Sequence, residues 1–209
     1  WGINGGIPVV LRADYHPLTI AVLFALIRSN AIVIPMTPAL ADKSPDLVEL
    51  SAAKVILSIS PSGAVDVTER SGTERHDYYL ELARRKVPGL VLFTSGSTGA
   101  PKAVVHDFSL LLQKFHKKRP AYVTLNFLMF DHWGGLNTLL HCLSNICLVV
   151  LPEKRTPEYI CDLIARHRIE LLPATPTFLN ILLISKAFVN KDLRALKLIS
   201  YGAEPMPEP

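Results

Sequence analysis

The 209-residue chain is 49% hydrophobic and 19% charged, a composition typical of a globular protein with a sizeable core and unlike that of a disordered chain. Lysine and arginine outnumber aspartate and glutamate by 22 to 18. This small surplus, spread over the whole length, argues against a nucleic-acid-binding protein, and no nucleic-acid partner is expected.

Apolar runs and helical patterns alternate along the first half of the chain. Strands are predicted at residues 7–13, 31–35 and 54–60, and helices at residues 17–30, 44–53 and 77–86. Pro17 fits the first turn of its helix, where a missing amide hydrogen does no harm, and Ser44 is predicted to cap the next helix. The polar, turn-rich segment at residues 61–73 is expected to be an exposed loop or a small excursion.

The alternation continues in the second half without repeating the sequence of the first. Helices are predicted at residues 108–118, 135–144, 156–168 and 176–185, and strands at residues 121–130, 145–152, 169–174 and 196–202. Strands that alternate with helices predict a mainly parallel sheet covered on both faces. The expected fold is therefore α/β, with two stacked alternating α/β units at residues 1–118 and 119–209.

A loop rich in hydroxyl and glycine residues, TSGSTGAPK, lies at residues 94–102 between two apolar runs. In open α/β sheets, ligands bind beyond the carboxyl ends of strands, where loops can present backbone amides. Gly96 and Gly99 let the backbone approach an anion closely, and Lys102 adds a positive charge. The hydroxyl donors are Thr94, Ser95, Ser97 and Thr98. Polyphosphate is the anion best suited to accept hydrogen bonds from so many donors, since each charge-assisted hydrogen bond contributes about 1.5–3 kcal/mol.

This loop does not follow the P-loop pattern GxxxxGK[ST]. The fifth residue after Gly96 is Pro101 instead of glycine, and Lys102 is followed by Ala103. A flexible Ser/Gly linker is the other alternative. Pro101 stiffens the loop, and its place between two predicted strands favours a phosphate-binding loop over a linker.

Four segments of the chain resemble motifs of one family. LVLFTSGSTGAPKAVVHD resembles the signature phosphate loop of the adenylate-forming (AMP-binding) superfamily, which comprises acyl- and aryl-CoA synthetases, luciferases and the adenylation domains of nonribosomal peptide synthetases. FLMFDHWGGLNTLL resembles its carboxylate-substrate segment, LLPATPTFLNILL the segment that lines its acyl pocket, and LKLISYGAEPMPE the strand and turn that close over adenine. Because their order and spacing also match, the chain resembles part of the large N-terminal domain of such an enzyme.

The resemblance implies an ATP-dependent carboxylate ligase. In the family, a carboxylate attacks the α-phosphate of ATP to give an acyl-adenylate and pyrophosphate, and a thiol then takes the acyl group. The thiol is that of CoA or of an acyl-carrier protein, and Mg²⁺ is expected as the counterion of the phosphates. Such an enzyme acts through positioning and electrostatic stabilisation rather than through covalent catalysis.

The resemblance also implies roles for individual residues. Those that match the family's phosphate loop are Thr94, Ser95, Gly96, Ser97, Thr98, Gly99 and Lys102. Those that match the acyl-substrate segments are Asp131, His132, Gly134, Gly135, Thr177 and Phe178, and those that match the adenine-side turn are Gly202, Ala203, Glu204 and Pro205. Lys102 and His132 are the candidate catalytic residues, and no residue is predicted as a metal ligand. The alternatives are a structural role for His132 and an ordinary core position for Phe178.

Asp131 leaves two classes of acid open. In amino-acid-activating adenylation domains, an aspartate after phenylalanine in this segment binds the α-amino group, and Phe130-Asp131 can be read in that way. The following HWGGLNTLL is more similar to acyl-CoA or acyl-carrier ligases, which favours a fatty or aryl acid. Asp131 is then expected to turn outward or to pair with a neighbour, because an unpaired carboxylate beside an apolar acyl chain is costly.

A complete member of the family continues beyond the GAEP-like turn. Its further motifs include a ribose-binding aspartate and a small mobile domain with a catalytic lysine, neither of which the chain matches. We therefore expect an excerpt of a longer enzyme, inactive or nearly so by itself. A non-catalytic, adenylation-like binding module and an ordinary flavodoxin-like phosphate-binding domain are the alternatives.

The cysteines and the longest apolar runs indicate the compartment. Cys142, Cys147 and Cys161 form neither a CxxC pair nor a set with paired histidines, so they are interpreted as buried thiols in a reducing compartment. The run at residues 20–27 is far shorter than the roughly 20 residues needed to cross a bilayer. The sequence predicts a soluble, cytoplasmic protein without a transmembrane segment.

Overall fold

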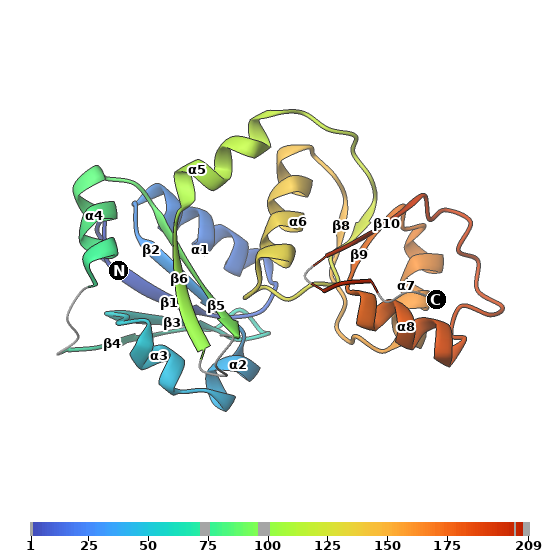
Figure 1. The fold of residues 1–209 in the computed structure, drawn as a ribbon, viewed down its shortest axis with the longest axis horizontal. Helices are drawn as coiled ribbons and strands as arrows, with labels where there is room; N and C mark the ends of the chain where they lie inside the picture. The colour runs from blue at the N-terminus through green and yellow to red at the C-terminus, as the bar shows by residue number, and fades with distance from the viewer. Residues whose placement is uncertain (1, 72–75, 96–100, 203, 207–209) are drawn as a thin grey trace. The chain divides into compact units, whose positions relative to one another are not determined.

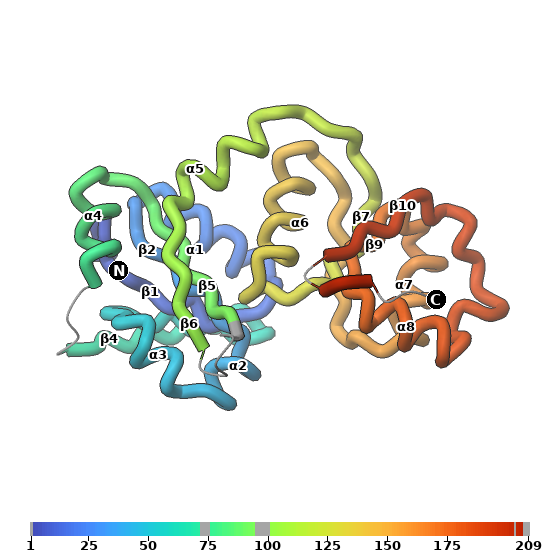
Figure 2. The backbone as a smooth tube through the Cα atoms, in the orientation of Figure 1, coloured from blue at the N-terminus to red at the C-terminus, as the bar shows by residue number. Residues whose placement is uncertain are grey.

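The computed structural model describes residues 2–71, 76–95, 101–202 and 204–206 (Figure 1). The chain divides into two compact units. The first comprises residues 1–114 together with Phe130–Trp133, and the second comprises residues 115–129 together with 134–209. The backbone trace in Figure 2 follows this course from the N-terminus to the C-terminus.

The first unit is built on a six-stranded sheet, counted over its described residues, in the order β4-β3-β1-β2-β5-β6. Its strands are β1 (Pro8–Arg12), β2 (Ile32–Met36), β3 (Val55–Ile59), β4 (Val65–Glu69), β5 (Gly89–Ser95) and β6 (Pro101–Asp107). The four central strands are parallel, and the two edge strands, β4 and β6, are antiparallel to their neighbours. Every residue of β2 is buried, as expected for a central strand of a parallel sheet.

Four of the five α-helices described in the first unit begin at a side-chain cap. The five are α1 (Pro17–Arg28), α2 (Pro38–Lys43), α3 (Asp46–Leu50), α4 (Asp77–Arg85) and α5 (Phe108–Gln113), the last of which continues into the 3-10 helix η1 (Lys114–His116). Caps in which a side chain accepts a hydrogen bond from the first turn are supplied by His16, Thr37, His76 and Asp107. Leu47 of α3 and Leu82 of α4 pack on Val10 and Ile34 of the sheet and cover one of its faces.

The second unit is built on a wholly parallel sheet, four-stranded over its described residues, in the order β10-β9-β7-β8. Its strands are β7 (Thr124–Leu125), β8 (Val149–Val150), β9 (Leu171–Ala174) and β10 (Leu198–Tyr201), and its helices are α6 (Trp133–Ser144), α7 (Pro157–His167) and α8 (Pro176–Ser185). Proline opens α7 and α8, where Thr156 and Thr175 cap the first turn. Ile160 and Ile164 of α7 pack with Leu125 and Leu172 in the core of this unit.

A strained position follows the end of α6. Ile146 has a φ of 57°, in the left-handed region that β-branched residues rarely adopt, and it is 92% exposed. The amide of the next residue, Cys147, donates to the carbonyl of Cys142 at 2.8 Å and so closes the helix end. The strained conformation of Ile146 therefore belongs to the turn that ends α6, and the isoleucine side chain remains almost fully exposed.

The α/β fold with mainly parallel sheets is confirmed, and three local predictions are wrong. Ser44 does not cap the next helix: it is the residue at which α2 ends, while α3 begins after Pro45 without a side-chain cap. Residues 65–69 are exposed, but they form strand β4 and not a loop, because their backbone pairs with the edge of β3. The helix predicted at residues 108–118 ends as an α-helix at Gln113.

Candidate functional site

The predicted phosphate loop joins the two strands of an antiparallel hairpin, β5 and β6. The register pairs Gly89 with Asp107 at the base of the hairpin and Thr94 with Lys102 near its far end. Directly opposed residues of an antiparallel pair lie on one face, with Cβ atoms about 4.5–5.5 Å apart. Because Thr94 and Lys102 are both exposed, the hairpin presents a hydroxyl and an ammonium group together.

Part of this predicted site lies outside the described residues. This is the case for Gly96, Ser97, Thr98 and Gly99, which connect β5 to β6 in the sequence. Ser95 is the last residue of β5, opposite Pro101. The described residues therefore give the two ends of the loop, and the roles of its central residues stay predictions.

The base of the hairpin is fixed by Asp107, where β6 ends and α5 begins. Its carboxylate accepts a hydrogen bond from the Leu110 amide at 3.3 Å and caps α5. Ser109 and Arg85 of α4 donate to the same carboxylate. Burial favours the neutral form, but these donors outweigh it and lower the pKa of Asp107 below its ordinary value. An ionised aspartate thus joins α4, β6 and α5.

Asp131 lies buried in the first unit and is fully engaged by neighbouring groups. Its side chain is only 2% exposed. The Oδ2 atom accepts from the backbone amide of Thr37 at 3.0 Å and from the Thr37 hydroxyl at 2.5 Å, and Oδ1 lies 2.7 Å from Nδ1 of His132. Burial raises the pKa of Asp131, but the hydrogen bonds from His132 and Thr37 outweigh it, so that the pKa is lowered. Asp131 therefore pairs with neighbours, one of the two placements expected for it.

His132 extends from this buried carboxylate towards solvent, with a side chain that is 66% exposed. The hydrogen bond to Asp131 is the main reason that the pKa of His132 is raised above its ordinary value, and partial burial opposes it. Because Nδ1 is used by Asp131, the neutral ring carries its proton there and leaves Nε2 as the second functional atom. Phe130, on the other side of Asp131, is buried and packs edge-on against Tyr15, with ring centroids 5.4 Å apart.

Thr37 is the residue of this cluster that the sequence analysis did not identify. It lies between β2 and α2, where its hydroxyl accepts from the Leu40 amide at 3.3 Å and its amide and hydroxyl both donate to Asp131. A threonine that follows a buried strand and precedes proline is a recognisable helix cap. That signal predicts the cap, but it does not indicate the carboxylate 94 residues away.

The predicted substrate glycines lie at the start of α6, in the second unit. A Cβ atom on Gly134 would come within 2.8 Å of Cδ1 of Leu128, so glycine permits this close contact. Gly135 is buried, and its carbonyl accepts from Nδ2 of Asn126 at 3.2 Å. Both residues thus have packing roles in addition to the substrate role predicted for them.

A second cluster joins one predicted acyl residue to one predicted adenine-side residue. Glu204 accepts from the amide of Thr177 at 3.2 Å and from its hydroxyl at 2.5 Å, at the first turn of α8. A carboxylate at this end of a helix is also favoured by the helix dipole. Gly202 and Pro205, on either side, are exposed, while Ala203 lies outside the described residues.

Phe178 lies in the core of the second unit. It is 6% exposed and packs on Phe127, with ring centroids 4.2 Å apart. Its position is the ordinary core placement weighed for it from the sequence, and the acyl-pocket role stays a prediction.

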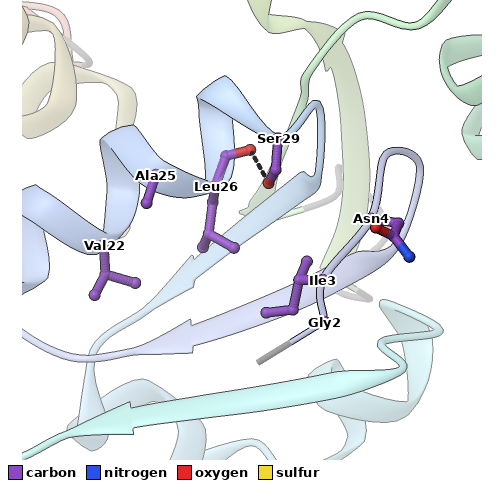
Figure 3. Close-up of a pocket in the computed structure, with 7 residues that line it drawn as sticks. All are labelled: Gly2, Ile3, Asn4, Val22, Ala25, Leu26 and Ser29. Atoms are coloured by element: carbon purple, nitrogen blue, oxygen red, sulfur yellow. Dashed lines mark hydrogen bonds between the residues drawn. The ribbon is translucent and has the colours of Figure 1, made fainter.

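A cavity of about 260 Å³ is lined by no predicted site residue. It lies between α1 and the N-terminal segment in the first unit. Its lining residues are Gly2, Ile3, Asn4, Val22, Ala25, Leu26 and Ser29 (Figure 3). The hydroxyl of Ser29 donates to the carbonyl of Leu26 at 3.1 Å, so the polar group at this wall is already bonded within α1.

The described residues contain neither a cluster of metal ligands nor a membrane-spanning helix. Among residues 2–71, 76–95, 101–202 and 204–206, no group of three or more histidine, cysteine, aspartate or glutamate side chains is arranged to hold a metal ion. In the same part of the chain, no helix has both the length and the apolar character required to span a bilayer.

Comparison with known proteins identifies the class to which this fold and these clusters belong. The AMP-binding enzyme family matches the chain over residues 1–209. The chain therefore belongs to the AMP-binding enzyme family, as its four motifs predict.

Curated relatives include both peptide synthetases and CoA ligases. A nonribosomal peptide synthetase of Malbranchea aurantiaca is 23% identical over 98% of this chain and 9% of its own length. An indoleacetate–CoA ligase of Aromatoleum aromaticum is 25% identical over 92% of this chain and 44% of its own length. The chain thus spans less than half of either relative.

Solved structures share the fold. The N-terminal domain of FACL13 from Mycobacterium tuberculosis superposes with a TM-score of 0.74 at 20% identity, covering 99% of this chain and 59% of that one. An anthranilate CoA ligase in complex with anthranoyl-AMP gives a TM-score of 0.76 at 16% identity, covering 99% and 46%. At these identities the likeness establishes the fold, which is that of the N-terminal domain of adenylate-forming enzymes.

Proposed function

We propose that the complete protein activates a carboxylic acid with ATP. A carboxylate oxygen would attack the α-phosphorus, the bond from that phosphorus to the pyrophosphate oxygen would break, and an acyl-adenylate and pyrophosphate would form. A thiol, of CoA or of a carrier protein, would then attack the acyl carbon, lose its proton to solvent and release AMP. The observation that carries the proposal is the register of the β5–β6 hairpin, which sets Lys102 opposite Thr94 beside the family's phosphate motif.

The hairpin suits a triphosphate in charge and in donor chemistry. The lysine ammonium and the threonine hydroxyl are donors, and a phosphate oxygen is a strong acceptor for both. The described residues offer no carboxylate cluster for a cation. We therefore propose that Mg²⁺ would be held largely by the phosphates themselves, as is common for this ion, and would offset their charge.

The surroundings of Asp131 support an acid without an amino group. An ammonium group would have to reach a side chain that is 2% exposed and displace donors from Thr37 and His132. Displacing the amide and hydroxyl of Thr37, which is 3% exposed, would leave buried polar groups unsatisfied, at a cost of about 1–3 kcal/mol each. We propose a fatty or aryl acid, approached by His132, as the substrate.

The Thr177–Glu204 pair supports an adenine-side role for the turn around residues 202–205. The amide and the hydroxyl of Thr177 hold the side chain of Glu204 at the first turn of α8. We propose that the turn approaches adenine through backbone atoms and that Glu204 has a structural role. A cytoplasmic location likewise stays a prediction.

The decisive experiment is ATP–pyrophosphate exchange on the complete protein with a panel of fatty, aryl and amino acids. Lys102→Met is expected to reduce exchange on the order of 100-fold, because it removes a charge from the transferring phosphates. Lys117→Met, at an exposed lysine remote in sequence from the loop, is the matched control and should leave exchange unchanged. Equal exchange in wild type and Lys102→Met would refute the role of the hairpin.

The same panel separates the alternatives. Exchange with amino acids alone would identify an amino-acid-activating adenylation domain. Binding of ATP without exchange for any acid would identify a non-catalytic binding module. Either result would overturn the proposed fatty or aryl acid ligase.

A further inference from the structure

The cluster of Thr37, Asp131 and His132 has the form of an orienting chain, in which each group holds the next. Thr37 supplies two donors to one oxygen of Asp131, and His132 engages the other oxygen through Nδ1. All three residues belong to the first unit. The order of exposure runs from Thr37, 3% exposed, through the buried carboxylate to the largely exposed imidazole.

The carboxylate of Asp131 is held by three hydrogen bonds. Two of the three hydrogen bonds to its carboxylate come from a single residue whose backbone is fixed between β2 and α2. The Thr37 hydroxyl has one hydrogen to donate, and the 2.5 Å contact commits it to Asp131. The same oxygen accepts from the Leu40 amide, so the Thr37 side chain cannot turn about χ1 without losing the cap of α2.

The hydrogen bonds to Asp131 determine the tautomer and the orientation of the His132 ring. A carboxylate that accepts from Nδ1 selects one tautomer and one ring orientation, and it stabilises the protonated ring. In the protonated ring, Nε2 carries a second N–H, which is the donor that an incoming carboxylate would require.

We propose that Thr37 and Asp131 are positioning residues that hold Nδ1 of His132, so that Nε2 is the atom presented to the carboxylate substrate. The proposal rests on the proposed function, because it assigns His132 to the acid side of that site. It changes the role of Asp131 from substrate contact to support of a neighbouring side chain, and it gives Thr37 a role beyond the cap of α2.

Histidine-selective ¹³C and ¹⁵N NMR of the complete protein tests the orienting chain of Thr37, Asp131 and His132 without requiring catalytic turnover. His132→Gln identifies the resonances of that ring. In wild type, the Nδ1–H tautomer and a pKa above the ordinary value are expected. Asp131→Asn should lower the His132 pKa, Thr37→Val should lower it by a smaller amount, and Thr37→Ser, which keeps the hydroxyl, should restore wild-type behaviour.

Thr156→Val is the matched control. Thr156 also precedes proline and caps a helix through its hydroxyl, but no carboxylate bond is formed by it among the described contacts of α7. Thr37→Val is expected to lower kcat/KM for the acid roughly 10-fold at unchanged KM for ATP, the scale of one lost charge-assisted hydrogen bond. Thr156→Val should leave both constants unchanged.

Two results would overturn the proposal. The first is a His132 tautomer and pKa that are the same in Asp131→Asn as in wild type. The second is a loss of kcat/KM in Thr156→Val equal to that in Thr37→Val, which would indicate general destabilisation. Failure of the proposed function is distinguishable, because it would appear as absent exchange in wild type while the NMR titration still reports the orienting chain.

Discussion

Asp107 offers a direct test of what anchors the β5–β6 hairpin. Asp107→Ala removes the cap of α5, which contributes about 1 kcal/mol. It also removes the pair with Arg85, whose side chain is 41% exposed, so that water screens the pair and about 0.5 kcal/mol is expected from it. The free energy of unfolding should therefore fall by about 1.5 kcal/mol, from the sum of these two contributions.

Asp107→Asn separates the two contributions, because asparagine caps a helix as well as aspartate does. It should cost only about 0.5 kcal/mol, and so should Arg85→Gln. Because the pKa of Asp107 is lowered in the folded protein, its charge contributes stability above about pH 4, and that contribution is lost as the pH falls through the folded pKa.

Urea denaturation of the complete protein at pH 7 and at pH 3 measures these differences. The gap between wild type and Asp107→Asn should shrink at the lower pH. An equal loss in Asp107→Asn and Asp107→Ala at pH 7 would refute the reasoning, because it would show that the cap contributes nothing.

Three further predictions concern stability and reactivity. Ile146→Gly should stabilise the protein by about 0.5–1 kcal/mol, since glycine adopts positive φ without strain. Ile184→Gly, at a position in α8 that is also solvent-facing, should destabilise it. Changes of the same sign for both variants in urea denaturation would contradict this prediction. The stabilising effect of the Asp131–His132 pair should be greatest from about pH 4 to 6.5 and decline on both sides, since the pKa of Asp131 is lowered and that of His132 raised; stability profiles of wild type and Asp131→Asn that stay parallel from pH 3 to 8 would rule it out. Burial raises the pKa of Cys142 to about 11, so iodoacetamide at pH 8 should modify it far more slowly in the folded protein than in urea, as mass spectrometry can show; equal rates would disprove the assignment.

The sequence predicted the elements whose side chains decide their structure. Strands β1, β2 and β3 were found from their apolar runs, and the proline-opened helices α1, α7 and α8 from helical periodicity and from residues such as Pro17, because burial and caps leave a local pattern. Strand β4 was missed because all of its side chains are exposed and only backbone pairing with β3 makes it a strand. Helix α2 was missed because six residues carry too little periodicity, and its start at Thr37 depends on a cap.

The candidate site divides in the same way. The motif at residues 94–102 is contiguous, so its composition and its place between two strands could be predicted from neighbouring residues. The antiparallel pairing that sets Lys102 opposite Thr94 was not predicted. The bond between Thr37 and Asp131 joins residues 94 positions apart, and no local pattern encodes such a contact. The same is true of Thr177 and Glu204, 27 positions apart, each of which was predicted singly and not as a pair.

The return of residues 130–133 to the first unit has a consequence for how the protein forms during synthesis. At about 5–20 residues per second, a ribosome needs roughly 5–20 s to proceed from Thr37 to Asp131. Throughout that interval, β1, β2 and α1 can assemble. The amide and hydroxyl of Thr37, however, cannot yet donate to the carboxylate of Asp131, because Asp131 has not been synthesised. No single break in the chain separates the two units, because the second unit's first segment, residues 115–129, precedes the last residues of the first. A nascent chain arrested before residue 131 should therefore yield an incompletely bonded first unit.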